Sequence, residues 1–148
     1  MAIITGAGQG IGEAYAHRFA KEGATVVVAD VNAEKGEAVA RAIGSGTVFE
    51  RVDVSDEADT QRLAQTVFDR TGKIDVLLNN AAIFYGIDNF DTSFAYLKKI
   101  FDVNYFGTWL TSRAVFPFMA RGGGGSVINQ SSSAARTSGS TPSRRARR

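Results

Sequence analysis

The feature that most constrains this chain is a run of alternating glycines between a short apolar segment and an amphipathic one. Met1–Thr5 reads MAIIT, and Thr5–Gly12 reads TGAGQGIG. Ile11, Tyr15 and Phe19 follow at the spacing of one helix face. A turn this tight between a strand and a helix needs residues without Cβ, and the helix N-terminus that it opens can bind an anion. The T-G-x-x-x-G-x-G pattern, which is not the strict G-x-G-x-x-G, therefore predicts a phosphate-binding turn rather than a bare structural one.

Apolar, β-branched runs alternate with helical patterns over the next 120 or so residues. Helices are predicted after the glycine turn, over 33–43, from a Ser55 cap to about Arg70, and over most of 93–119, where Pro117 should end or bend the last turn. Strands alternating with helices predict an α/β fold with a doubly wound parallel sheet of the Rossmann type. The predicted strands cover residues 1–5, 25–29, 47–54, 74–78 and 126–129.

Composition excludes several kinds of site. The chain has no cysteine and one histidine, His17, so disulfides, thiol catalysis, Cys-ligated zinc and multi-histidine metal sites are ruled out. No apolar run approaches the roughly 20 residues that span a bilayer, and charged residues interrupt any signal-peptide core. We expect a cytoplasmic protein with no membrane partner.

The basic charge of the chain is confined to its end. Five of the 17 Lys and Arg lie within 136–148, and all 15 Asp and Glu lie at or before Asp102, so residues 1–135 carry 12 basic against 15 acidic side chains. We expect a domain over 1–135 and a disordered Arg/Ser-rich tail over 136–148. An acidic body argues against a nucleic-acid partner.

Asp30 stands at the end of the second predicted strand, 18 residues after Gly12. In a dinucleotide-binding fold a carboxylate near this spacing accepts hydrogen bonds from the adenosine ribose and repels a 2′-phosphate. Neither Gln9 nor Val31 offers a cation for that phosphate. These residues favour NAD over NADP, whereas a solvated strand-end carboxylate is the alternative.

Five motifs in order resemble the classical short-chain dehydrogenase/reductase family over residues 1–135. They are the glycine turn, Asp53-Val54, Asn79-Asn80-Ala81-Ala82, Asn104 in VNYFGT, and the serines that follow INQ. The family usually has glycine where Ala82 stands. The resemblance implies hydride transfer between a nicotinamide and a secondary alcohol or ketone, in a homo-oligomer. The residues that it assigns to the cofactor are Thr5, Gly6, Gly10, Ile11, Gly12, Asp30, Asp53, Val54, Asn80 and Ala81.

For catalysis the resemblance assigns a water-holding role to Asn104 and a substrate-binding role to Ser132, although Ser131 and Ser133 leave the register open. The family's Tyr-x-x-x-Lys should begin about 13 residues after the serine, and that count reaches Arg145. No tyrosine follows Tyr105 and no lysine follows Lys99. We therefore expect a fragment or a frameshifted product that lacks the family's later strands and helices and binds cofactor at most.

Two other readings stay open. One is a catalytically inactive dinucleotide- or partner-binding fragment, which would self-associate because strand 126–129 becomes a sheet edge. The other is a nucleic-acid binder that works through the arginine tail, and the acidic body makes it the weakest. The substrate is not readable from these residues.

Overall fold

The computed structural model describes residues 1–44, 46–83 and 92–132, and these form a five-stranded, fully parallel sheet in the order β3-β2-β1-β4-β5. This confirms the predicted doubly wound α/β fold with a parallel sheet. The predicted tail, 136–148, lies outside the described residues. The strands are β1 (Ala2–Thr5), β2 (Val26–Asp30), β3 (Val48–Arg51), β4 (Val76–Asn79) and β5 (Ser126–Asn129).

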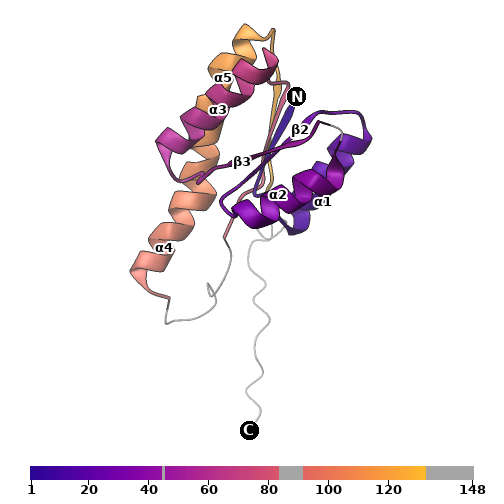
Figure 1. The fold of residues 1–148 in the computed structure, drawn as a ribbon. Helices are drawn as coiled ribbons and strands as arrows, with labels where there is room; N and C mark the ends of the chain where they lie inside the picture. The colour runs from indigo at the N-terminus through magenta and orange to yellow at the C-terminus, as the bar shows by residue number, and fades with distance from the viewer. Residues whose placement is uncertain (45, 84–91, 133–148) are drawn as a thin grey trace.

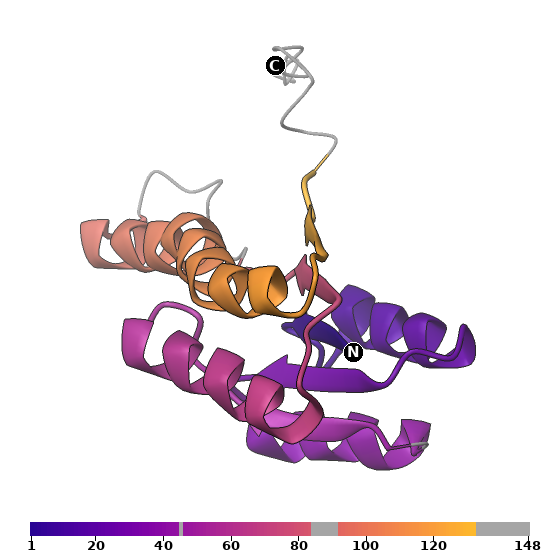
Figure 2. The same cartoon turned by 90° about the horizontal axis from the view of Figure 1, so that it is seen from above.

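Helices cover both faces of the sheet (Figure 1). The helices α1 and α2 lie on one face and α3 and α5 on the other, as the view from above also shows, while α4 extends the α5 layer beyond the strands (Figure 2). Their bounds are α1 (Gly10–Lys21), α2 (Ala33–Ile43), α3 (Glu57–Thr71), α4 (Phe94–Phe101) and α5 (Gly107–Arg121), with a π-helical turn η1 (Asp102–Phe106) between the last two.

Alternation along the central strands divides the core into two clusters. Ile3 of β1 and Leu77 of β4 pack with α3 and α5, while their neighbours Ile4 and Leu78 pack with α1 and α2. All four side chains are buried because a parallel sheet is covered on both faces. The continuous apolar runs in the sequence reflect this double burial.

Local caps correct one prediction and confirm another. Asp56, not Ser55, caps α3: its side chain accepts a hydrogen bond from the Asp59 N–H at 3.1 Å. The Ser55 hydroxyl instead donates to Asp53 Oδ1 at 2.6 Å. The third strand also ends at Arg51 rather than at residue 54. In the turn that follows it, Asp53 Oδ1 accepts hydrogen bonds from both the N–H and the hydroxyl of Ser55. Gly72, with φ of 71°, follows the last residue of α3, Thr71, which agrees with the predicted end near Arg70.

The predicted helix over 93–119 contains a π-helical turn that the sequence did not indicate. Ser93 caps α4, and η1 then inserts before α5. Pro117 does not end the helix, which continues to Arg121.

The fifth strand lies at one edge of the sheet. Every residue of β5 is exposed, with Val127 at 41 % and Ile128 at 43 %. Among the described residues its only strand partner is β4, and in Figure 2 it stands apart from the helical layers. This fits the prediction that the strand forms a sheet edge.

Candidate functional site

A cleft of about 580 Å³ opens beside the carboxyl ends of β1 and β2. Ligand sites in open α/β sheets lie at this end of the strands, and the volume is within the usual range for a small-molecule site. The cleft brings together most of the residues that the sequence singled out for the cofactor: Gly6, Gly10, Ile11, Gly12, Asp30, Asp53, Val54, Asn80 and Ala81.

The glycine turn is packed so closely that side chains are excluded from two of its positions. A Cβ on Gly12 would lie 2.1 Å from the Gly6 carbonyl oxygen and 2.5 Å from Asn80 Nδ2. A Cβ on Gly6, whose φ is +65°, would lie 2.7 Å from Ala81 Cα. The turn is therefore clamped between α1 and the segment that follows β4.

Gly10 presents the opposite situation. It begins α1 with φ of +62°, and a Cβ there would meet nothing within 4 Å. The N-cap residue Gln9 makes no side-chain capping bond, whereas the N-cap side chains of α2 and α3 do. No side chain therefore caps the first N–H groups of α1, and the space beside Gly10 is open, which suits an anion.

The Asp30 carboxylate lies against the glycine turn at Gly8. Its Oδ2 accepts a hydrogen bond from the Gly8 N–H at 2.8 Å, and its Oδ1 accepts one from the Asn32 N–H at 2.9 Å. A Cβ on Gly8 would lie 2.9 Å from Oδ2, so the glycine allows this approach. Asp30 lines the cleft, and each of its carboxylate oxygens keeps further acceptor capacity.

The Asp53-Val54 segment is fixed from two sides. The Asp53 N–H donates to Asp59 Oδ2 at 3.0 Å. That bond, together with the Arg62 guanidinium, lowers the pKa of the Asp59 carboxyl. Gly107 of α5 packs against Val54, where an added Cβ would lie 2.7 Å from Cγ2. Asp59 and Gly107 are therefore positioning residues that the sequence argument missed.

Thr5 has a positioning role in this structure. It is 1 % exposed, and its Oγ1 accepts hydrogen bonds from the N–H groups of Asn80 and Ala81. Asn80 Nδ2 in turn donates to the carbonyl oxygens of Thr5 and Gly6. The end of β1 is thus bound to the segment after β4, and Thr5 is not among the described residues that line the cleft.

Asn79 is buried and joins three elements. Its Nδ2 donates to Ser112 Oγ and Asn129 Oδ1, and its Oδ1 accepts from Thr111 Oγ1 at 2.6 Å. The side chain therefore ties β4 to α5 and to β5.

Asn104 lies in η1, and its amide bonds both backbone groups of Ile83: Oδ1 accepts from the Ile83 N–H and Nδ2 donates to the Ile83 carbonyl, each at 2.9 Å. Ile83 lines the cleft, so Asn104 positions its wall. The water-holding role implied by the family stays a prediction.

The serines lie beyond the end of β5. Tyr15 of α1 donates to Gln130 Oε1 at 2.7 Å, which fixes the residue before Ser131. Ser131 and Ser132 are exposed, and Ser133 lies outside the described residues. The choice among the three serines stays open.

The cleft also contains residues that the sequence argument did not assign. Lys99 and Val103 lie one helical turn apart and line it from α4 and η1. Val103 directly precedes Asn104 and Lys99 lies four residues before Val103, so the sequence could have placed both on the helix face next to Asn104. The other lining residues are Gln9, Ala29, Val31, Val52, Ala82 and Ile83.

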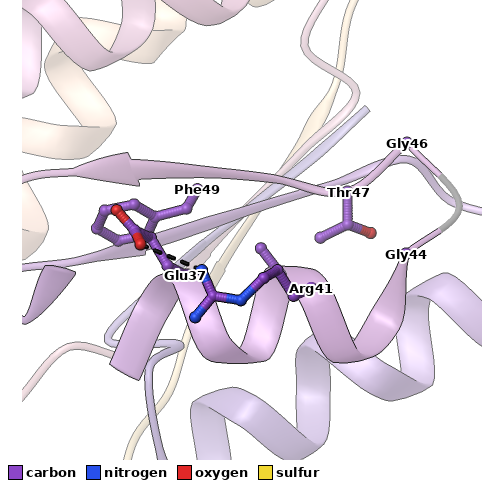
Figure 3. A pocket seen from close by; sticks show the side chains of 7 residues that line it. Glu37, Arg41, Gly44, Gly46, Thr47 and Phe49 are labelled. Carbon is purple, nitrogen blue, oxygen red and sulfur yellow. Dashed lines mark hydrogen bonds and ion pairs between the residues drawn. The ribbon is translucent and has the colours of Figure 1, made fainter. Parts of the chain in front are cut away.

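A second hollow, of about 360 Å³, lies over α2 and β3 (Figure 3). Arg41 and Glu37 form an ion pair at 3.2 Å beside the Phe49 ring, so their charges are mutually satisfied. Thr47 Oγ1 is buried there without a hydrogen-bond partner among the described residues. The hollow shares no residue with the glycine turn.

Other kinds of site find no support in the described part of the chain. No group of three or more His, Cys, Asp or Glu residues in it could hold a metal ion. Within 1–44, 46–83 and 92–132, no helix has the length and apolarity to cross a membrane.

Comparison with known proteins agrees with the geometry. The family model for short chain dehydrogenases matches residues 1–143. An uncharacterized oxidoreductase of Mycobacterium tuberculosis (strain CDC 1551 / Oshkosh) is 45 % identical over 141 residues, which cover 91 % of this chain and 57 % of the relative. A sorbitol dehydrogenase of Cereibacter sphaeroides is 39 % identical over 136 residues (91 % and 53 %). The 7alpha-hydroxysteroid dehydrogenase of Escherichia coli (strain K12) is 37 % identical over 137 residues (90 % and 53 %). The chain spans about half the length of the curated relatives it matches.

Proposed function

Because this chain belongs to the short chain dehydrogenase family, we propose that it binds NAD in the cleft beside the glycine turn. Its ancestral reaction is hydride transfer between the cofactor and a secondary alcohol or ketone. The observation that carries the proposal is the open, uncapped start of α1 at Gly10, in the same cleft as the Asp30 carboxylate.

Different residues of the cleft match different parts of a dinucleotide. Gly10 and Gly12 would receive the pyrophosphate at the N-terminus of α1. Asp30 would accept the ribose hydroxyls, and its negative charge would repel a 2′-phosphate, which favours NAD over NADP. Val54 would pack against the adenine ring, with Asp53 at its amine. When bound, the nicotinamide supplies the hydride chemistry.

The 148 residues offer binding groups for the cofactor but no Tyr-x-x-x-Lys after Ser132. A positioned acid/base contributes ~10²–10⁴ in rate. We propose that this chain by itself binds cofactor without sustained turnover. Cytoplasmic location stays a prediction.

A second copy of the chain is the partner that the surface favours. Large apolar side chains are exposed along α4, η1 and α5, and exposed apolar patches commonly mark association sites. Phe94 is 80 % exposed and Trp109 is 52 % exposed. The others are Leu97, Phe101, Tyr105, Phe106 and Phe116.

Calorimetric titration with NADH and NADPH tests the cofactor proposal. We expect tighter binding of NADH, and Asp30→Asn should narrow the difference while keeping an acceptor for the Gly8 N–H. Asp69→Asn, on exposed α3 surface, is the matched control. Equal affinities in the unaltered chain, or tighter binding of NADPH, would refute the preference.

A further inference from the structure

A lysine lies beside the end of the cleft that holds Asp30. Lys35 Nζ donates a hydrogen bond to Gln9 Oε1, although the two residues are 26 positions apart. Gln9 stands within the glycine turn and lines the cleft together with Asp30. The glycine turn has no basic residue of its own in the sequence, but the fold brings the Lys35 ammonium group next to it.

This placement is built into the contact between α2 and the turn. Lys35 lies in the first turn of α2, and its N–H donates to the Asn32 side chain at 3.0 Å. A Cβ on Gly8 would lie 3.3 Å from the Gly36 nitrogen and 2.9 Å from Asp30 Oδ2. The start of α2, the Asp30 carboxylate and the glycine turn thus pack directly against one another.

The charge of Lys35 is available to a ligand. The side chain is exposed, and no ion pair joins it to a carboxylate within the residues that the structure describes. Its hydrogen-bond partner, the Gln9 amide, is neutral. An ammonium group in this position can attract a phosphate at the adenosine ribose.

We propose that Lys35 is the specificity residue that opposes Asp30, contacting the 2′-phosphate of NADP(H) and so limiting the preference for NAD. The proposal rests on the proposed dinucleotide site. Asp30 penalises the 2′-phosphate by like charge, and Lys35 offsets part of that penalty. The chain should therefore bind NADPH measurably, though more weakly than NADH.

Titration calorimetry with NADPH and NADH on the full chain tests this assignment. Lys35→Ala should weaken NADPH binding roughly two- to fivefold, the size of one exposed charged contact, and change NADH binding less than about 1.5-fold. Lys35→Glu should weaken NADPH binding further. Lys21→Ala, which removes an exposed lysine from the other end of α1, should change neither affinity.

The same Lys35→Ala substitution in an Asp30→Asn background keeps the loss measurable, because NADPH binds more tightly there. Equal losses for both cofactors would show that Lys35 merely supports the turn, and no loss for either would show that it does not reach the ligand. Each of these results overturns the assignment while leaving the proposed function intact. If the unaltered chain binds neither cofactor, the proposed function itself fails.

Discussion

Gly12→Ala should both destabilise the fold and abolish tight cofactor binding. The added Cβ would lie 2.1 Å from the Gly6 carbonyl oxygen, whereas real Cβ atoms essentially never approach closer than 3.0 Å. The carbonyl would have to retreat by about 1 Å. It is held by Asn80 Nδ2, and Ala81 blocks Gly6 on another side, so the turn has little freedom to yield.

The expected magnitude is the difference of two effects. Overpacking of this kind costs roughly 1–3 kcal/mol, and replacing glycine by alanine within a helix returns up to about 1 kcal/mol. We expect a net loss of about 1–2 kcal/mol, or a fall in melting temperature of roughly 3–10 °C for a domain of this size. NADH affinity should fall by about tenfold or more, because the displaced carbonyl belongs to the phosphate-binding turn.

Thermal unfolding followed by far-UV circular dichroism, with NADH titration, measures both effects. Ala14→Gly is the control: it lies on the exposed face of the same helix, should cost about 0.5–1 kcal/mol, and should leave NADH binding unchanged. An unchanged or raised melting temperature for Gly12→Ala, with normal NADH affinity, would refute the clamped turn.

Three further predictions concern pH, turnover and association. The Asp53 N–H and Arg62 lower the pKa of the Asp59 carboxyl in the folded chain. The resulting stabilisation is therefore present above the ordinary carboxyl pKa of 3.8 and is lost as the pH falls through the lower folded value. Asp59→Asn should be less stable than the unaltered chain at neutral pH by about 1–2 kcal/mol, and a difference that stays constant down to acid pH would contradict this. With secondary alcohols and NAD, the purified chain should produce NADH at background rate only, and sustained production that Ser132→Ala abolishes would show that its active site is complete. Light scattering after size-exclusion chromatography should show self-association that Trp109→Lys reduces, whereas a monomer peak with a cooperative thermal transition would show that the exposed apolar surface needs no partner.

Local sequence signals accounted for much of the fold. The predicted helix over 33–43 matches α2, because Asn32 caps it and Gly44 follows it. The continuous apolar runs of β1 and β2 identified strands that are buried on both faces. The cap of α3 was misassigned because Ser55 and Asp56 are both good cap residues, and the choice depends on Asp53, which takes the Ser55 hydroxyl.

Contacts between distant segments were beyond local reasoning. The π-helical turn places Asn104 where it bonds Ile83, 21 residues earlier, and no local pattern announces such an insertion. Lys35 was overlooked for the same reason, because its hydrogen-bond partner Gln9 is 26 residues earlier in the sequence, before β2. Both residues become visible only when the sheet brings their segments together.

The residues that we propose for cofactor binding and the serine that the family resemblance assigns to catalysis lie in different parts of the structure. The contacts that shape the turn join β1, β2 and the segment after β4, as the bonds of Asn80 to Gly6 and of Gly8 to Asp30 show. All of these groups lie in the described residues, so contacts within this chain shape the cleft. Ser132, in contrast, follows an exposed edge strand. We therefore expect NADH binding without sustained turnover, and failure to bind NADH would count against the proposed role of the glycine turn.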